Sequence, residues 1–275
     1  MRIDSHQHFW KLSRGDYGWL TPEFEPLFRD FLPEDLLPKL KTCDVDQTIL
    51  VQAAPTIDET RFLLELAGRH EFIAGVVGWV DFGNPDAEAH IRELSRDPKL
   101  VGLRPMIQDI ADDDWMLRKE NEPAYRCMIE ENLVFDALVL PRHLPNLQTL
   151  VQRFPALRVI IDHGAKPPIR EKIPDSWFSD MASLSTFPQI SCKVSGLVTE
   201  AAPEWTREDL EPVIQHLLER FGPDRLLWGS DWPVLEMAGK YEEWFQVSQI
   251  AFQNLTEPER QGIFGDNAKR LYLNP

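Results

Sequence analysis

Two histidines stand two residues apart near the start of the chain, in the stretch DSHQHFW from Asp4 to Trp10. Side chains at positions i and i+2 of a β-strand point to the same face. On a strand, His6 and His8 would therefore project together, with Asp4 on the same side below them. Imidazoles serve as proton carriers, as donors to a developing oxyanion and as metal ligands. The two histidines are either incidental or half of a reaction site. The residues in the rest of the chain distinguish these two interpretations.

Further side chains that could do chemistry follow later apolar runs. They are Trp79, Arg104, His163, Lys166, Lys193, Asp231 and Trp232. Each has an ordinary structural alternative: His163 could be a core histidine, Asp231 a helix cap, and Lys193 a side chain that extends out of the core. Arg104 could pair with a core acid such as Asp136. Taken together they gather at one end of otherwise apolar strands, and burying such groups without a role is costly.

The elements that must position these residues are eight short apolar runs, which predict eight β-strands. The runs span residues 1–6, 47–53, 72–80, 99–105, 133–140, 157–163, 189–197 and 225–233. Segments with helical periodicity lie between most of them, at 59–70, 85–97, 122–132, 144–155, 177–188 and 207–222, and a last one at 257–273. Apolar strands that alternate with helices are typical of a parallel sheet buried on both faces.

Eight such units in 275 residues predict one distorted (β/α)8 barrel of the TIM type, with residues 1–275 forming a single domain. No GxGxxG motif follows the first strand, which argues against a dinucleotide site. Active sites of these barrels lie at the carboxyl ends of the strands. The irregular stretch 9–33, rich in aromatic residues and prolines, is predicted to cover that mouth as a long first loop.

Composition excludes several classes of partner. The chain has 45 acidic against 29 basic residues and a net charge of −16, whereas nucleic acids and anionic membranes require a cationic face. Three separated cysteines form neither a disulfide framework nor a metal knuckle, which favours a reducing, cytoplasmic location. We also expect no signal peptide and no membrane span. A homo-oligomer stays open.

Five stretches in order resemble the amidohydrolase superfamily: DSHQHFW, DHGAKP from Asp162, CKVSGL from Cys192, GSDWPV from Gly229 and FGDNAKRLYL from Phe264. More narrowly, with DYGWL from Asp16 and GLRPMIQD from Gly102, they resemble its amidohydrolase-related branch of sugar lactonases. The resemblance spans nearly the whole chain. It implies a distorted barrel and maps the superfamily site onto His6, His8, His163 and Asp231.

The resemblance also bears on metal use, because many superfamily members are zinc hydrolases. No Lys or Glu stands at the end of the fourth or fifth predicted strand, and Lys193 occupies the seventh, so a binuclear site is not expected. His6, His8, His163 and Asp231 could hold one zinc with an open position. The branch also includes enzymes that work without a divalent metal. We expect no cofactor to be required, with one divalent metal such as zinc as the alternative.

The resulting hypothesis is hydrolysis of a sugar (aldono-) lactone to its aldonic acid, with a small neutral sugar lactone as substrate. Asp231 would be the general base, and His6, His8 and His163 would stabilise the oxyanion with Lys193 or Lys166. Arg104, Trp79 and Trp232 would bind the ring. A serine nucleophile is not expected, because Ser195 and Ser230 show no paired base. Alternatives are a zinc-dependent decarboxylase or other mononuclear metal hydrolase, and an inactive binding protein on the same barrel.

Overall fold

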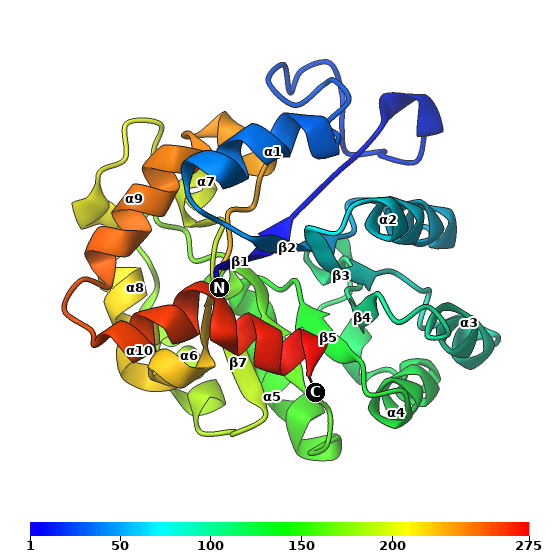
Figure 1. The fold of residues 1–275 in the computed structure, drawn as a ribbon. Helices are drawn as coiled ribbons and strands as arrows, with labels where there is room; N and C mark the ends of the chain where they lie inside the picture. The colour runs from blue at the N-terminus through cyan, green and yellow to red at the C-terminus, as the bar shows by residue number, and fades with distance from the viewer. Residues whose placement is uncertain (275) are drawn as a thin grey trace.

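Eight parallel strands close into a barrel in the computed structural model, which describes residues 1–274 (Figure 1). The strands pair in chain order from β1 to β8. Their bounds are β1 Ile3–Gln7, β2 Gln47–Val51, β3 Ile73–Gly78, β4 Leu100–Leu103, β5 Val134–Ala137, β6 Val159–Ile161, β7 Ile190–Val194 and β8 Leu226–Trp228. A parallel bridge between Gln7 and Trp232 joins β1 to the chain beyond β8. The predicted barrel is confirmed. Seven of the predicted runs contain their strands, and β1 extends one residue beyond the first run, to Gln7.

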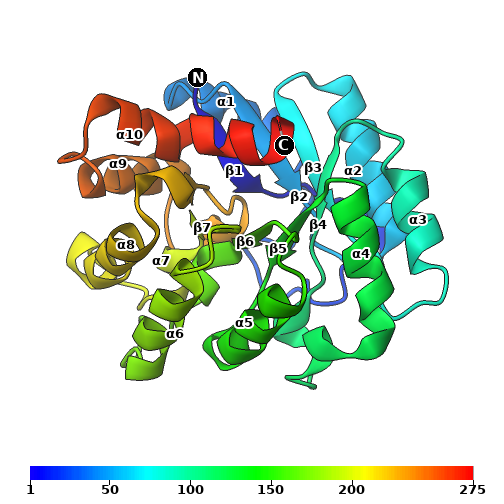
Figure 2. The ribbon, with the colours of Figure 1, turned by 90° about the horizontal axis from the view of Figure 1, so that it is seen from below.

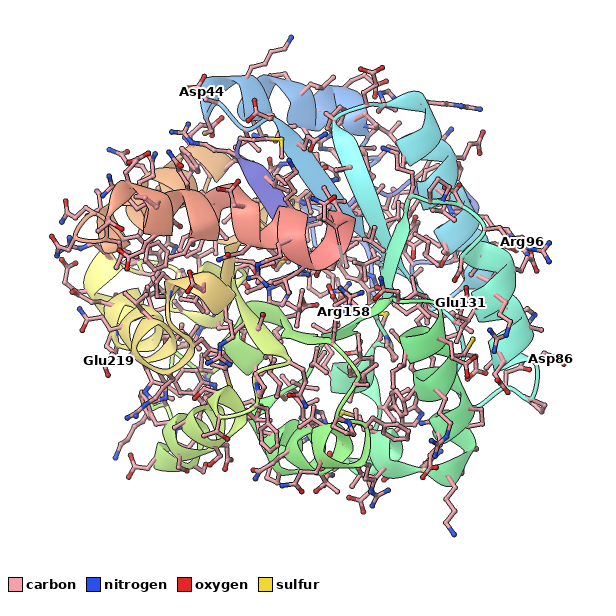
Figure 3. All side chains as sticks on the ribbon, turned by 60° about the horizontal axis from the view of Figure 1, so that its bottom comes forward. Asp44, Asp86, Arg96, Glu131, Arg158 and Glu219 are labelled. Atoms are coloured by element: carbon pink, nitrogen blue, oxygen red, sulfur yellow. The ribbon has the colours of Figure 1, made fainter. Side chains whose placement is uncertain are left out.

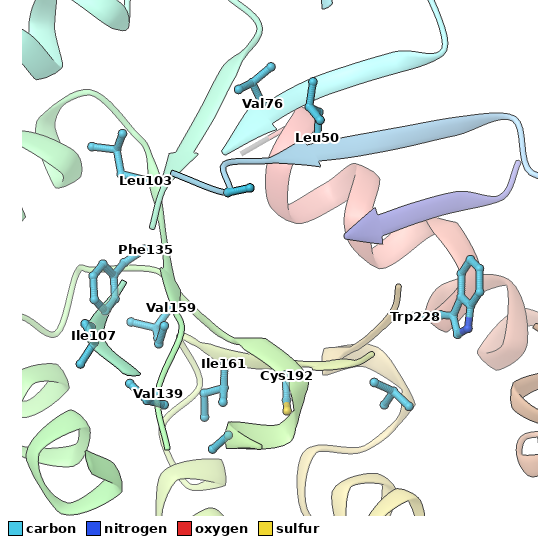
Figure 4. Close-up of a cluster of buried hydrophobic side chains, with 14 of the residues drawn as sticks. Leu50, Val76, Leu103, Ile107, Phe135, Val139, Val159, Ile161, Cys192 and Trp228 are labelled. Carbon is cyan, nitrogen blue, oxygen red and sulfur yellow. The ribbon is translucent and has the colours of Figure 1, made fainter. Parts of the chain in front are cut away.

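The strands are buried on both faces because their side chains alternate between two apolar layers. Leu50, Val76, Phe135 and Trp228 belong to the large cluster between the barrel and its helices, part of which Figure 4 shows. A smaller cluster fills the interior, with Ile3, Ile49, Val51, Val77, Val101, Val134, Ile160 and Leu227 among its members. This two-sided burial explains why the strands read as almost continuous apolar runs.

Helices surround the barrel. They are α1 Pro33–Thr42, α2 Ile57–Arg69, α3 Ala87–Leu94, α4 Glu122–Glu130, α5 Leu144–Arg153, α6 Asp175–Ser185, α7 Leu197–Glu200, α8 Arg207–Phe221, α9 Tyr241–Ala251 and α10 Glu257–Gln261. The sequence analysis did not predict α1, α7 and α9. Charged side chains such as Asp86, Arg96 and Glu219 point outward from the helical layer (Figure 3). Within residues 1–274, no helix is long and apolar enough to cross a bilayer.

The end of the barrel where the strands begin is closed by the C-terminal segment. It crosses beside the N-terminus in both ribbon views (Figures 1 and 2). Ala268 and Tyr272 pack into the interior cluster. The predicted single helix 257–273 is interrupted at Gly265, where an added Cβ would lie 2.2 Å from the Met1 carbonyl oxygen. The chemistry is therefore confined to the opposite end of the barrel.

The long first loop packs over that opposite end. Trp10 pairs with Phe31 through two backbone hydrogen bonds of 3.0 Å and is fully buried. The Trp19 indole donates to the Ala53 carbonyl just beyond β2, with a length of 2.7 Å. Aromatic edge-to-face contacts join Trp10 to Trp19 and Phe31. These contacts make the loop a packed cover over the first strands, as predicted.

Candidate active site

Four predicted residues converge at the mouth of the barrel. His6 is the penultimate residue of β1 and His8 follows that strand, while His163 and Asp231 lie shortly after β6 and β8. The Nε2 atoms of His6 and His8 lie 3.2 Å apart. Asp231 Oδ1 lies 3.3 Å from His8 Nε2, 3.7 Å from His6 Nε2 and 3.8 Å from His163 Nε2. One carboxylate oxygen thus faces three imidazoles.

Fixed acceptors and donors orient two of these rings. His8 Nδ1 donates to the Val51 carbonyl at 2.8 Å, which leaves Nε2 facing Asp231. His163 Nδ1 lies 2.9 Å from Ser195 Oγ. The expectation that Ser195 has no paired base was therefore wrong, because β6 and β7 are neighbours in the sheet. Ser195 is fully buried, so its hydroxyl positions the ring and does not face a substrate.

Unusual backbone conformations aim His163 and Asp231 into the site. His163, Gly164, Ala165 and Lys166 have consecutive positive φ angles between 51° and 62°, and Asp231 has φ 59°. Residues other than glycine rarely adopt this region, and such strain persists only where the surroundings determine it. Gly196 has φ 61°, and a Cβ there would lie 2.5 Å from His163 Nδ1. The loops after β6, β7 and β8 thus fit around one another.

A buried ionic layer lies beneath His6. Lys193 Nζ lies 2.5 Å from Asp136 Oδ2, 3.0 Å from Asp162 Oδ1 and 3.2 Å from His6 Nδ1. The Tyr272 hydroxyl donates to Asp136 at 2.7 Å. All of these side chains are essentially inaccessible. Lys193, which the sequence suggested as a substrate contact, instead supports His6 from within the barrel, because its position on β7 points it into the interior.

Arg104 connects this layer with the mouth. Its Nη1 lies 3.3 Å from His6 Nε2 and 3.4 Å from Asp162 Oδ2. The structural alternative was that Arg104 pairs with a core acid such as Asp136. Arg104 does lie beside a buried acid, but that acid is Asp162, and Asp136 pairs with Lys193. Gln52 holds the guanidinium in position, with Oε1 accepting from Arg104 Nη2 at 2.8 Å and from Nε at 3.2 Å.

The electrostatics favour an ionised carboxylate at Asp231. Burial raises the pKa of Asp231, but its interactions with His163 and with His8 and His6, including the hydrogen bond with His8, outweigh burial and bring the pKa below the usual range. Burial lowers the pKa of His163 to about 4. Burial, together with the Lys193 ammonium, lowers the pKa of His6 as well. At pH 7 these shifts leave Asp231 able to accept a proton.

Several expected residues lie elsewhere. Asp4 accepts hydrogen bonds from the Ser230 amide and the Tyr241 hydroxyl, so it does not share a face with His6; an irregularity in β1 between Asp4 and Gln7 breaks the alternation. Lys166 pairs with Glu200 at 3.1 Å. Trp232, expected to contact substrate, is fully buried and packs edge-to-face on Phe9 and Phe31.

The donor set at the mouth fits a divalent metal. His6, His163 and Asp231 each offer one ligand atom, and these atoms lie within 4.8 Å of one another. Two imidazoles and a carboxylate form a set that zinc accepts, with a fourth position left for water or substrate. His8 Nε2, 3.2 Å from His6 Nε2, borders the same space. An ion there would stand close to the Arg104 guanidinium.

A chamber of about 510 Å³ lies over the ends of β2, β3 and β4, at the same end of the barrel as this cluster. Two of its lining residues connect it with the cluster. Pro105 directly follows Arg104, and the Trp19 indole donates to the carbonyl of Ala53, which directly follows Gln52. Trp79, which the sequence analysis predicted to contact the substrate ring, lines this chamber. Asp16 and Trp19 of the first loop also line it and were not among the predicted site residues. The lining residues are Asp16, Gly18, Trp19, Pro55, Trp79, Val80, Asp81, Phe82, Pro105, Met106, Asp109, Ile110 and Trp115.

A parallel barrel that brings three imidazoles and an ionised carboxylate together at the carboxyl ends of β1, β6 and β8 is a hydrolytic enzyme of the amidohydrolase type. The chain belongs to this family, because the family described as Amidohydrolase matches residues 3–273. The resemblance seen in the sequence is thereby confirmed.

Three relatives extend the comparison. An L-fucono-1,5-lactonase of Burkholderia ambifaria is 45% identical, covering 98% of this chain and 95% of the relative. An L-fucono-1,5-lactonase of Burkholderia multivorans is 38% identical, over 100% and 97%. The crystal structure of an amidohydrolase from Burkholderia multivorans with bound zinc superimposes with a TM-score of 0.95 at 36% identity, covering both chains fully.

Proposed function

We propose that this protein hydrolyses a sugar (aldono-) lactone of the L-fucono-1,5-lactone or L-rhamnonolactone kind to the aldonic acid. The observation that carries the proposal is the Asp231 carboxylate facing three imidazoles at the barrel mouth. Two relatives of similar length are named for this activity. A neutral lactone also fits a site in which one guanidinium, that of the buried Arg104, borders the cluster. A dicarboxylate would demand several such cations.

The reaction needs a base, an oxyanion site and a proton for the leaving oxygen. Asp231 takes a proton from water as the water oxygen attacks the lactone carbonyl carbon. The carbonyl oxygen becomes negatively charged in the tetrahedral intermediate. When this collapses, the ring carbon–oxygen bond breaks and Asp231 returns the proton to the ring oxygen. The product is one open chain that carries a carboxylic acid and a hydroxyl group. The acid ionises at neutral pH to the carboxylate and releases one proton to solvent.

His6 and Arg104 are the best placed donors to the oxyanion. The Lys193 ammonium only donates, so His6 Nδ1 accepts from it at 3.2 Å and Nε2 carries the ring proton toward the mouth. Arg104 Nη1 stands 3.3 Å from that Nε2. Losing one donor of this kind typically lowers kcat by about 10²–10³.

A bound metal is compatible with the same residues. His6, His163 and Asp231 would hold it, and it would supply a Lewis acid that polarises the lactone carbonyl. His8 and Arg104 would remain free to bind and orient the substrate. We expect turnover without added metal, with zinc dependence as the alternative.

The test is proton release from a panel of aldono-1,4- and aldono-1,5-lactones, corrected for uncatalysed hydrolysis, on protein of measured metal content. We expect turnover, and a fall in kcat of at least about 10³-fold for Asp231→Asn, since the variant cannot accept the proton. Asp112→Asn is the control, because Asp112 is a surface carboxylate that pairs with Arg118. If the Asp231→Asn variant hydrolyses lactones at the wild-type rate, Asp231 is not the general base.

Chelation distinguishes the metal alternatives. Activity that persists after chelation, on protein with little metal, supports the expectation. Activity that is lost on chelation and restored by stoichiometric zinc supports the metal-dependent alternative. The absence of turnover on every lactone would refute the proposed function.

A further inference from the structure

The chamber over the ends of β2, β3 and β4 is large relative to a single reacting group. Liquid water occupies about 30 Å³ per molecule, so 510 Å³ corresponds to roughly 17 waters. The histidines and Asp231 are not among its lining residues. With the lactone carbonyl at the cluster, the rest of the ring and its substituents therefore extend into the chamber.

The walls are suited to an uncharged ring. Trp19, Trp79 and Trp115 are each partly exposed, and Met106 and Ile110 complete an apolar surface. Indole faces pack against the apolar face of a ring while leaving its hydroxyl groups free. A polyhydroxylated ring still needs polar partners at its edge.

Asp16 supplies one such partner. Its Oδ2 accepts from Arg14 Nη2 at 2.7 Å and from Thr56 Oγ1 at 3.0 Å. Its other oxygen, Oδ1, is buried and has no hydrogen-bond partner. An unsatisfied buried carboxylate oxygen is costly unless a donor reaches it. A ligand hydroxyl in the chamber is such a donor.

The ionisable side chains that line the chamber are all acidic. Asp16, Asp81 and Asp109 are its only ionisable lining residues among residues 1–274, and no Lys, Arg or His joins them. Asp81 and Asp109 are exposed at the opening. An anionic substituent would meet like charges there, while a hydroxyl or methyl group would not.

We propose that this chamber is the specificity subsite of the enzyme, which binds the non-reacting part of a neutral lactone and rejects lactones that carry a second carboxylate. The proposal rests on the proposed function. Trp19, Trp79 and Trp115 hold the ring face, Asp16 Oδ1 accepts a ring hydroxyl, and Asp81 with Asp109 exclude anions. The selection acts on substituents remote from the scissile bond.

The experiment compares two lactones that differ at one position, a neutral aldono-1,5-lactone and the matched lactone with a carboxylate in place of the terminal carbon group. For wild type we expect kcat/KM to favour the neutral lactone by at least about tenfold at low ionic strength. Added salt should reduce this preference, because the excluding charges face solvent. In Asp81→Asn/Asp109→Asn the ratio should fall by about tenfold.

A charge-matched control separates local from global effects. Asp44→Asn/Asp224→Asn also removes two exposed carboxylates, but these precede β2 and β8 at the opposite end of the barrel. It should keep the wild-type ratio. Asp16→Asn should raise KM for the neutral lactone more than it changes kcat, because the lost contact is remote from the carbonyl.

Two results would overturn the proposal: equal kcat/KM for both lactones in wild type, or an unchanged ratio in Asp81→Asn/Asp109→Asn. If wild type hydrolyses neither lactone, the proposed function fails. The subsite is then tested by binding alone, in tryptophan fluorescence titrations of the protein with each of the two lactones. Tighter binding of the neutral lactone, with the difference reduced in Asp81→Asn/Asp109→Asn, supports the subsite, and equal binding refutes it.

Discussion

Lys193 illustrates how a single buried cation organises the site. Its ammonium lies between Asp136, Asp162 and His6, and none of these side chains is accessible. Burial raises the pKa of Asp162, but the interactions with Lys193 and His6 outweigh burial and hold that pKa well below its usual range. Together with Arg104, whose Nη1 lies 3.4 Å from Asp162 Oδ2, the ammonium therefore balances the charge of this buried carboxylate.

Removing this cation should destabilise the fold. Lys193→Met leaves Asp136 and Asp162 without their shared partner, so we expect the free energy of unfolding to fall by about 3–5 kcal/mol. Lys193→Met/Asp136→Asn should recover part of that loss, because one uncompensated charge is gone. Denaturant unfolding followed by circular dichroism measures both. A Lys193→Met variant as stable as wild type would contradict this account.

At this scale the sequence predicted the reactive residues better than their supports. His6, His8, His163 and Asp231 could be predicted to converge because each follows a strand, and parallel strands end at one edge. The pairing of Lys193 with Asp136, and of Ser195 with His163, depends on side-chain direction and register between neighbouring strands. Asp4 was assigned to the wrong face because an irregularity in β1 leaves no clear mark in the sequence.

The left-handed turn from His163 to Lys166 is the element that places His163. It packs against Gly196 at the end of β7, whose φ of 61° is allowed without strain only for glycine. An added Cβ would lie 2.5 Å from His163 Nδ1 and 3.1 Å from Asp231 Oδ2. The two loops can therefore keep their reactive side chains together only while this position has no side chain.

Gly196→Ala should consequently lower kcat/KM strongly while the protein stays folded. We expect kcat/KM to fall by at least about 10²-fold, because displacement by 1 Å of a reacting group has that effect. The free energy of unfolding should fall by about 1–3 kcal/mol from backbone strain. Gly68→Ala is the control, since Gly68 lies in α2 with open space around it. Wild-type kinetics in Gly196→Ala would show that His163 does not need this placement.

Among the elements, strands were easier to predict than helices. Most strands carry short apolar runs, such as QTILV in β2 and IAGVVG in β3, whereas β1 is mostly polar. Helix α1 was missed because Pro33 and Pro38 suggest a loop, although Pro33 occupies the first helical position, where proline is tolerated. Helix α9 was missed although Trp244 and Phe245 bury one of its faces. The break at Gly265 reflects close approach to Met1, a contact between the two ends of the chain.

The stability of the whole barrel should depend on pH through Glu59. This carboxyl on α2 is fully buried and accepts hydrogen bonds from the amides of Ala53 and Ala54 after β2. Burial raises its pKa to about 8 from an ordinary value of 4.5. The folded protein then binds this proton more tightly than the unfolded chain, so the stabilisation is complete below pH 4.5 and is lost as the pH rises toward 8.

We expect Glu59→Gln to lose that dependence. Between pH 5.5 and 7.5 the free energy of unfolding of wild type should decline relative to the variant by about 1 kcal/mol per pH unit. Paired denaturation curves at several pH values measure the difference, and contributions from other carboxyls such as Asp136 cancel in the comparison. Parallel pH profiles for the two proteins would show that Glu59 is ionised in the folded state.

The acidic chamber also bears on what happens after the ring opens. Under the proposed reaction an uncharged molecule enters and an anion must leave past Asp81 and Asp109. Like charges at the exit weaken rebinding of the acid, so the product competes poorly for the site even when it accumulates. The same two carboxylates would thus favour binding of the closed ring over rebinding of the open-chain acid.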